Sequence, residues 1–386
     1  MARVACCVCS SAMLVFALGI PAASAGRVTV LRTTIGPTQL RSQGFGYSVA
    51  YRTIESGGRT RVVIRLFLYD SDRWRDVTPS ALRADEVDTI DDVAFVDRLH
   101  GWVAGYNCAR ATVYLYRTSD GGRSWQSLGA PGGHSCGGGP TYLSFPDELH
   151  GWMEPVSPNA PAGELLGTSN GGRTWKQLTT TPPCLAPIRF VSRSAGWMGR
   201  CLFNRSAGVA YSTHDGGRRW KPVSIPVPDE AMARLDVPQF FGSTGVVAAT
   251  IGNRPADEPG STKSVAFSIT RDGGSHWSLQ SVRAVGACPM SIYSSGVWPA
   301  AIAGPRTWWI VGGARRPVVQ VSVDGGRSWH AVVASGLPAR RCSVVTVSAA
   351  DARTAWVVAR EQGYNTALFQ STDGGRTWTR ARPSRG

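Results

Sequence analysis

The sequence predicts an all-β fold built from repeated small antiparallel sheets, and three observations predict it. An eight-residue pattern occurs six times, and its closing tryptophans lie 45 to 57 residues apart. Gly and Pro are abundant, with 45 and 24 copies, and no helical periodicity persists for long. A unit of about 50 residues has the length of four short strands with their turns, which is the usual period of a β-propeller blade.

The recurring pattern reads Ser or Thr, any residue, Asp or Asn, Gly, Gly, two further residues and Trp, and we call it the turn repeat. An Asp side chain accepts hydrogen bonds from backbone N–H groups and so closes a turn. The paired glycines supply the positive φ that such a turn needs, and the Trp begins the next strand. The pattern therefore predicts a structural hairpin and not an active site. Its third position is occupied by Asp120, Asn170, Asp215, Asp272, Asp324 and Asp373.

The turn repeat resembles the Asp-box, or BNR repeat, of sialidases, some glycoside hydrolases, sortilin-type receptors and photosystem II stability/assembly factor-like proteins. This resemblance implies a β-propeller in which the repeat joins the third and fourth strands of each blade. A Gly-Trp motif lies about 23 residues before several copies, as in Gly101-Trp102, Gly151-Trp152 and Gly196-Trp197. The combination most resembles the photosystem II assembly factor-like group, which implies a binding scaffold.

Residues 1–25 have the pattern of a secretory signal peptide. Arg3 supplies a positive charge, Val4 to Ile20 is apolar, and Ala23-Ser24-Ala25 is a small-residue cleavage site. We expect the segment to be cleaved and the mature protein to be secreted, or to lie in the periplasm or cell envelope. No later stretch reaches the length of a membrane span. Residues 26–386 are predicted to form a single propeller domain.

Seven blades are expected in this domain. Counting back 51 residues from Trp125 reaches Trp74, which ends a degenerate copy that starts at Tyr69 and lacks the glycines. In each blade the first strand precedes the Gly-Trp motif, the second carries it, the third precedes the turn repeat and the fourth follows its Trp. The place of residues 27–34 stays open, because residues 343–380 already supply four strands to the last blade.

Six cysteines follow the signal segment, and an even number in an exported chain predicts three disulfides. None of the six forms a C-x-x-C pair, and histidines are few, so neither a zinc site nor any other cofactor is expected. All six are placed on the face opposite the turn repeats. Proximity there favours the pairs Cys108–Cys136, Cys184–Cys201 and Cys288–Cys342 among fifteen possible connectivities.

The formal net charge of +15 comes almost entirely from arginine. We call the face that carries the turn repeats the turn face, and the opposite face, where propellers usually bind, the loop face. Candidate ligand-binding residues in the predicted second-to-third-strand loops of that face are Arg110, Arg200, Arg205, Arg315, Arg316 and Arg360. They suggest a protein or an acidic polymer or glycan as partner. The alternative is a general arginine bias, since five turn repeats also carry Arg.

Three other functions fit the sequence less well. Nucleic-acid binding is not expected, because no stacking platform or known module is present and export removes the usual partner. The acidic run from Asp85 to Asp92 suggests Ca²⁺, but its spacing matches no EF-hand loop and a solvated connection fits better.

Sialidases that share the box use an arginine triad, a Tyr–Glu pair and an acid Asp, with an Arg-Ile-Pro signature that this chain lacks. Glu55 and Glu154 are the candidate carboxylates for that chemistry.

The sequence thus predicts a monomeric, non-enzymatic propeller that serves as a binding or assembly scaffold. The alternative is an exo-acting glycoside hydrolase of sialidase type, which requires two carboxyl groups about 5 Å apart in a retaining enzyme. Partner identity is not determined by the residues themselves.

Overall fold

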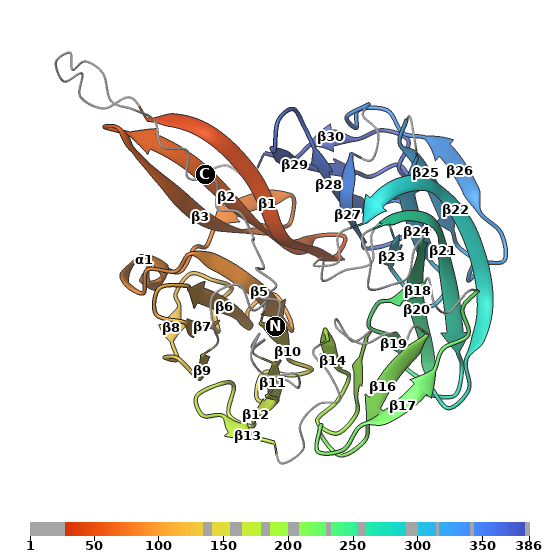
Figure 1. The fold of residues 1–386 in the computed structure, drawn as a ribbon, viewed down its shortest axis with the longest axis horizontal. Coiled ribbons are helices and arrows are strands. Elements are labelled where there is room, and N and C mark those ends of the chain that lie inside the picture. The colour runs from red at the N-terminus through yellow and green to blue at the C-terminus, as the bar shows by residue number, and fades with distance from the viewer. Residues whose placement is uncertain are drawn as a thin grey trace, which may run out of the picture.

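The computed structural model describes residues 28–133, 141–154, 164–178, 186–199, 208–228, 233–252, 260–290, 300–313, 316–339 and 343–382. These residues form seven antiparallel sheets arranged around a central axis as a seven-bladed β-propeller (Figure 1). Within them the single helix is α1 (Ala81–Ala84), which lies between the first two blades. The predicted all-β class and blade number are confirmed.

The first four blades follow one another along the chain, and each runs from its inner to its outer strand. Blade 1 contains β1 (Thr29–Ser42), β2 (Phe45–Ser56), β3 (Arg59–Asp70) and β4 (Arg73–Asp76). Blade 2 contains β5 (Thr89–Phe95), β6 (Gly101–Asn107), β7 (Thr112–Thr118), β8 (Gln126–Ser127) and β9 (Gly132–Gly133). Blade 3 contains β10 (Tyr142–Ser144), β11 (Gly151–Glu154), β12 (Leu166–Thr168) and β13 (Lys176–Gln177). Blade 4 contains β14 (Ile188–Phe190), β15 (Gly196–Met198), β16 (Val209–Thr213) and β17 (Lys221–Ser224).

The last three blades complete the ring. Blade 5 contains β18 (Ala233–Leu235), β19 (Gln239–Phe241), β20 (Thr244–Gly252), β21 (Gly260–Thr270) and β22 (Ser278–Met290). Blade 6 contains β23 (Ala300–Ile302), β24 (Trp308–Gly312), β25 (Val318–Ser322) and β26 (His330–Val333). Blade 7 contains β27 (Val344–Ala349), β28 (Ala355–Arg360), β29 (Thr366–Ser371) and β30 (Thr379–Arg380). Blades 2 and 5 keep the four-strand order, because β8 and β9 both pair with β7, and β18 and β19 both pair with β20.

The turn repeat forms the predicted hairpin, as blade 4 illustrates. The Thr213 hydroxyl donates to Asp215 Oδ1 at 2.9 Å and accepts the Gly217 N–H at 3.0 Å. Asp215 Oδ1 also accepts the Arg219 N–H at 2.9 Å. Gly216 and Gly217 have φ values of +74° and +88°, a region that favours glycine. All the fixed residues of the repeat except its Trp are therefore used to close the turn.

Blade 1 closes its last hairpin without glycines. Ser71 and Asp72 form a two-residue turn with φ values of +49° and +66°, the conformation that a tight β-hairpin requires. The Tyr69 hydroxyl donates to Asp72 Oδ1 at 2.5 Å and holds the turn. Trp74 lies on β4, so the degenerate copy occupies the position predicted for it.

Tryptophans of the Gly-Trp motif join neighbouring blades. Trp102 of blade 2 stacks on Phe145 of blade 3 with ring centroids 3.7 Å apart and an interplanar angle of 6°. Its indole N–H donates to the carbonyl of Gly171, in the turn repeat of blade 3, at 3.0 Å. The tryptophans are core residues, because Trp102, Trp308, Trp309 and Trp356 are at most 2% exposed.

The ring closes between blade 7 and β1, and this settles the place of the N-terminal strand. β1 pairs with β2 as the inner strand of blade 1, while blade 7 supplies its own four strands. Side chains of blade 7 accept backbone N–H groups of β1: Asn365 Oδ1 from Thr33 at 2.8 Å and Thr366 Oγ1 from Ile35 at 2.6 Å. Closure therefore uses side-chain hydrogen bonds and not a strand shared between two blades.

Two sequence placements are corrected by the strand bounds. The acidic run was expected in a connection, but β5 begins at Thr89, so Asp91 and Asp92 lie on the inner strand of blade 2. The cause is the length of β6, whose Tyr106 pairs with Thr89. Cys288, expected in a connection between blades on the loop face, lies within β22, which extends because it pairs with the long β21.

Candidate functional site: the loop face and the central channel

Three of the predicted arginines belong to the described structure, and all three are exposed. Arg110 lies in the turn between β6 and β7, Arg316 shortly before β25, and Arg360 at the end of β28. Each position is at the end of a second strand or the start of a third, so blades 2, 6 and 7 present them on the loop face. Arg200, Arg205 and Arg315 lie outside the described residues.

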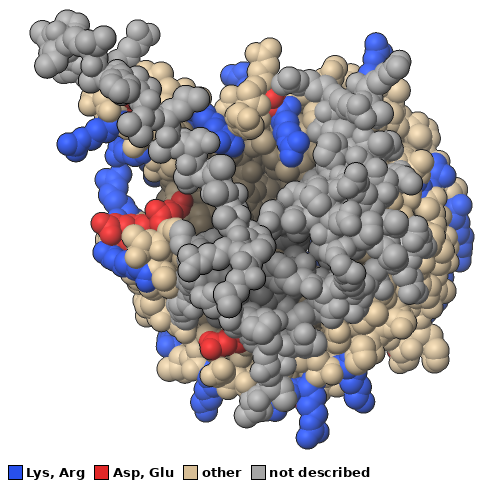
Figure 2. All heavy atoms as spheres, viewed as in Figure 1, with Lys and Arg blue, Asp and Glu red and all other residues tan. Residues whose placement is uncertain are grey.

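These arginines differ in their contacts. The Arg110 guanidinium donates to Glu86 Oε2 at 2.9 Å and to the Tyr114 hydroxyl at 3.2 Å. No described residue forms an ion pair with Arg316 or Arg360. Glu361, next to Arg360 in the chain, pairs with Arg380 at 3.0 Å. In Figure 2 basic side chains are spaced around the rim of the molecule, and acidic ones are visible at few places.

Among the six cysteines, only Cys108 has a described side chain. Cys108 directly follows β6, on the loop face as predicted, and it is disulfide-bonded. Cys136, Cys184, Cys201 and Cys342 lie outside the described residues, and of Cys288 only the backbone is described. The three pairings therefore remain predictions.

The inner strands line the central channel, where each sheet has a free edge. Polar side chains of one blade accept backbone N–H groups of the next inner strand. Asp92 Oδ2 of β5 accepts from Leu143 of β10 at 2.9 Å, and Ser144 Oγ of β10 accepts from Phe190 of β14 at 2.7 Å. These hydrogen bonds satisfy edge groups that would otherwise be left unpaired, so they hold the ring together.

A group of opposite charges from three inner strands faces this channel. Burial raises the pKa of Asp92 to about 7, although the N–H groups of Leu143 and Val93 lower it. Burial likewise raises the pKa of Asp236, next to β18, and the positive charge of Arg189 partly offsets this. The pKa of Arg189 on β14 is lowered by burial, and Asp236 opposes that shift most strongly. The opposite charges of Arg189 and Asp236 thus offset part of the cost of burying them.

Sequence reasoning missed Arg189 and Asp236 and took Asp92 for part of a connection. The available signal was a single charged residue at a strand position flanked by apolar ones, as in Ile188-Arg189-Phe190. Alternation along a strand puts such a residue on a different side from its neighbours. The sequence pattern alone does not distinguish a charged residue that faces solvent from one that faces the channel, because the ring geometry decides between them.

The two carboxylates proposed for hydrolysis are not brought together as a pair. Glu55 is exposed near the end of β2 in blade 1, whereas Glu154 is fully buried at the end of β11 in blade 3, with blade 2 between them. The carboxyl oxygens of Glu154 accept no well-formed hydrogen bond from the described residues. Burial raises the pKa of Glu154 well above its usual value, and the nearby Ala186 amide offsets only part of that.

Metal-ligating side chains do not gather in the described part of the chain: no group of three His, Cys, Asp or Glu residues there is arranged to hold an ion. The described residues also contain no helix with the length and apolar character of a membrane span.

No protein-family model and no curated protein sequence matches the chain. Solved structures that resemble it include YCF48 bound to a D1 peptide, with a TM-score of 0.47 and 21% identity over 76% of this chain and 80% of that one. YCF48 from Cyanidioschyzon merolae has a TM-score of 0.49 and 16% identity, covering 77% and 86% of the two chains.

Two peptidases also resemble the chain. One is a prolyl endopeptidase, with a TM-score of 0.52 and 12% identity over 92% of this chain and 49% of that one. The other is a post-proline cleaving enzyme from Rickettsia typhi, with a TM-score of 0.51 and 10% identity over 92% and 53%. The chain spans about half the length of these two enzymes. At such identities the similarity concerns the fold alone.

Proposed function

We propose that the protein is an exported β-propeller that binds a partner protein or another acidic polymer at its loop face and performs no chemistry on it. In this proposal residues 1–25 are a cleaved signal peptide, and the mature domain acts as a monomer outside the cytoplasm. The turn repeats are Asp-boxes, and the protein acts as a scaffold, as its resemblance to photosystem II stability/assembly factor-like proteins implies.

The observation that carries the proposal is how the polar side chains are used. The turn repeats close hairpins, as the contacts of Asp215 with Thr213 and Arg219 show. Asp92 of the channel accepts backbone N–H groups of Leu143 and Val93. Arg316 and Arg360 of the loop face form no ion pair with a described residue, whereas Arg110 is bonded to Glu86, and guanidinium groups suit carboxylates of a partner.

The distribution of these arginines favours a macromolecular partner. Arg110, Arg316 and Arg360 belong to blades 2, 6 and 7, so a ligand that contacts all of them has to cross a large part of the face. A small molecule is usually enclosed by a single concave pocket. An acidic surface on a partner protein meets the requirement of many contacts, each of them weak.

One observation favours the alternative, an exo-acting glycosidase. A general acid needs a carboxyl group with a raised pKa, and burial raises the pKa of Glu154 well above its usual value. Glu55, the other candidate carboxyl group, lies in blade 1 and is not the second group beside it.

The test combines charge reversal with a hydrolysis assay. Binding of labelled poly-glutamate to the purified protein is measured by fluorescence anisotropy. Wild type is compared with a triple variant that carries Arg110→Glu, Arg200→Glu and Arg315→Glu. We expect the variant to bind at least about tenfold more weakly at low salt, with a smaller difference at high salt, because charges are screened within about 10 Å at 0.1 M. Equal binding by both proteins would refute the proposal.

The hydrolysis arm separates the two functions. Wild type, Glu55→Gln and Glu154→Gln are incubated with fluorogenic sialosides and other glycosides. The scaffold proposal predicts no release of fluorophore by any of them. Turnover by wild type that is lost in one of the two carboxyl variants would establish the enzyme in its place.

A further inference from the structure

Half of β3 in blade 1 has no outer neighbour among the described residues. β3 runs from Arg59 to Asp70, but β4 pairs only with residues 67–70. Leu66 is the last residue with partners on that side, since its N–H donates to Thr78 Oγ1 and its carbonyl accepts from Val77, both at 2.9 Å. The chain then leaves the sheet towards α1, and no described strand pairs with residues 59–65 on their outer side.

The backbone groups on this free edge follow from the β2–β3 register. The two-residue turn Gly57-Gly58 makes Ser56 and Arg59 the closing hydrogen-bonded pair. Hydrogen-bonded pairs alternate in an antiparallel ladder, so residues 61, 63 and 65 bond to β2. The N–H and C=O groups of Thr60, Val62 and Ile64 therefore point outward, where no described residue bonds to them.

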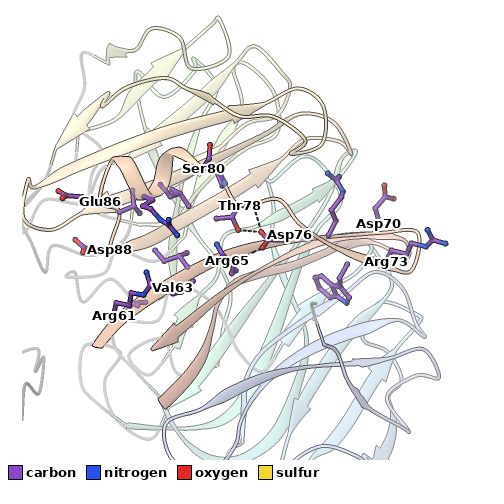
Figure 3. Close-up of a pocket in the computed structure, with 18 residues that line it drawn as sticks. Arg61, Val63, Arg65, Asp70, Arg73, Asp76, Thr78, Ser80, Glu86 and Asp88 are labelled. Carbon is purple, nitrogen blue, oxygen red and sulfur yellow. Dashed lines mark hydrogen bonds and ion pairs between the residues drawn. The ribbon is translucent and has the colours of Figure 1, made fainter. Parts of the chain in front are cut away.

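A groove of about 1310 Å³ lies along this edge, and we call it the edge groove. One wall is β3 from Arg61 to Arg65, and the other is formed by residues 79–88 around α1. Figure 3 shows Arg61, Val63 and Arg65 along the strand, with Glu86 and Asp88 across from them. The groove occupies the position that a full-length fourth strand of blade 1 would take.

The unpaired charge in the edge groove is positive. Its acidic residues are all bonded: Asp70 to Arg98, Asp76 to Arg65 at 3.4 Å, Glu86 to Arg110 at 2.9 Å, and Asp88 to the Cys108 N–H at 2.6 Å. Arg75 donates to the carbonyl of Gly121 at 2.6 Å. By contrast, no described residue is bonded to the guanidinium groups of the exposed Arg61, Arg73 and Arg83.

We propose that an extended acidic segment of a partner protein binds in the edge groove as an added outer strand of blade 1. Its backbone pairs with Thr60, Val62 and Ile64, and alternate acidic side chains meet Arg61 and its neighbours. The remaining side chains cover Val62, which is 53% exposed on this edge. Apart from the Arg110–Glu86 ion pair on its wall, the edge groove does not include the arginines of the loop face, so it adds a second contact to the proposed function.

The probe is a synthetic peptide, Ac-Thr-Glu-Val-Glu-Val-Glu-Thr-NH₂, with a fluorescent label, and binding is measured by anisotropy at low salt. Two N-methylated forms serve as matched controls, one methylated on the three Glu residues and the other on the two Val residues. Successive N–H groups of a strand point to opposite sides. We therefore expect one methylated form to bind at least about tenfold more weakly and the other to bind like the parent peptide.

Variants of the protein test the same contact from the other side. Val62→Pro removes an outward N–H while leaving the ladder to β2 intact, as edge positions tolerate Pro. Arg61→Glu reverses a free charge in the groove, and Arg193→Glu, in an exposed turn of blade 4, is the matched control. Val62→Pro and Arg61→Glu should each weaken binding at least about fivefold, and Arg193→Glu should not change it. Amide exchange in residues 59–66 should slow when the peptide is present.

Several results would overturn the proposal. Equal binding of all peptide forms would mean that charge alone attracts them, without strand addition. Absence of binding at about 1 mM peptide would also exclude the proposal, because it would mean an affinity below that of typical transient complexes. A dimer of the protein that Val62→Pro dissociates would show that the edge is occupied by a second copy of the chain. The double variant Arg200→Glu, Arg315→Glu keeps the Arg110–Glu86 pair of the edge groove and should bind the peptide like wild type, so failure here is distinguishable from failure of the loop-face proposal.

Discussion

The indole N–H of Trp152 donates to the carbonyl oxygen of Gly216 at 2.9 Å. Trp152 belongs to the Gly-Trp motif of blade 3, and Gly216 is the first glycine of the turn repeat of blade 4. The Trp152 ring also stacks on Phe190 of blade 4 with centroids 3.6 Å apart. The two motifs that recur along the sequence therefore meet across a blade boundary, and Trp102 with Gly171 repeats the contact one blade earlier. Both motifs therefore hold neighbouring blades together.

Changing Asp215→Ala should lower the free energy of unfolding by about 1–3 kcal/mol, because the Arg219 N–H and the Thr213 hydroxyl lose their acceptor. Asp215→Asn is the matched control and should cost much less, since Asn170 makes equivalent contacts in blade 3. Urea unfolding measures both. Binding of poly-glutamate at the loop face should survive in both variants, and its loss in a stable Asp215→Ala protein would show that the turn repeat has a role beyond folding.

The two glycines of one turn repeat should respond differently to a methyl group. Both Gly273 and Gly274 have positive φ, so Ala at either position costs about 1 kcal/mol. A Cβ at Gly273 meets no atom within 4 Å, whereas one at Gly274 overlaps the ring of Trp197 in the preceding blade. We expect Gly274→Ala to be less stable than Gly273→Ala by about a further 1–3 kcal/mol in urea unfolding. Equal losses would mean that the blade boundary is not packed as described.

Ser348→Ala should weaken the seam between blades 7 and 1. Ser348 Oγ accepts the N–H of Leu40 at 2.9 Å, and Leu40 is 3% exposed, so water does not easily replace the lost partner. The expected cost is about 1–3 kcal/mol. Ser335→Ala is the control, because the exposed hydroxyl of Ser335 bonds to Arg376 where water can substitute. Amide exchange of β1 that is unchanged in Ser348→Ala would contradict this account of ring closure.

Stability should depend on pH through Asp92. The pKa of Asp92 is raised by burial to about 7 from 3.8, so the folded protein holds a proton there that the unfolded chain releases. Its stabilising contribution is complete below about pH 4 and is lost as the pH rises through 7. The unfolding free energy of wild type relative to Asp92→Asn should therefore fall between about pH 4 and 7 and then level off. A difference that rises with pH would mean that the ionised carboxylate is the favoured form.

Mapping of peptides under non-reducing conditions tests the disulfides. We expect the links Cys108–Cys136, Cys184–Cys201 and Cys288–Cys342, of which only the bonded state of Cys108 is described. Each link should contribute about 2–4 kcal/mol by restricting the unfolded chain. Free thiols at these positions would contradict the prediction of three bonds, and other links would correct the pairing.

The sequence by itself determined the repeating unit and its turns. Asp215, Gly216 and Gly217 specify a local hairpin through their own side chains and backbone preferences, so the pattern carries the same meaning wherever it occurs. The period of the tryptophans then predicted seven blades, including the degenerate one that ends at Trp74. These features depend on contacts between residues a few positions apart, and such contacts can be recognised without the fold.

Only the tertiary structure decided which residues make contact across blade boundaries and which strand edge has no described partner. The electrostatic interaction of Arg189 with Asp236 and the hydrogen bond from the Leu40 N–H to Ser348 Oγ join residues distant in the chain, and Glu154 is buried in a different blade from Glu55. The free edge of β3 likewise depends on where β4 stops, which the degenerate turn repeat does not reveal. Closing the ring brings these groups together or keeps them apart, because the position of each blade depends on all the others.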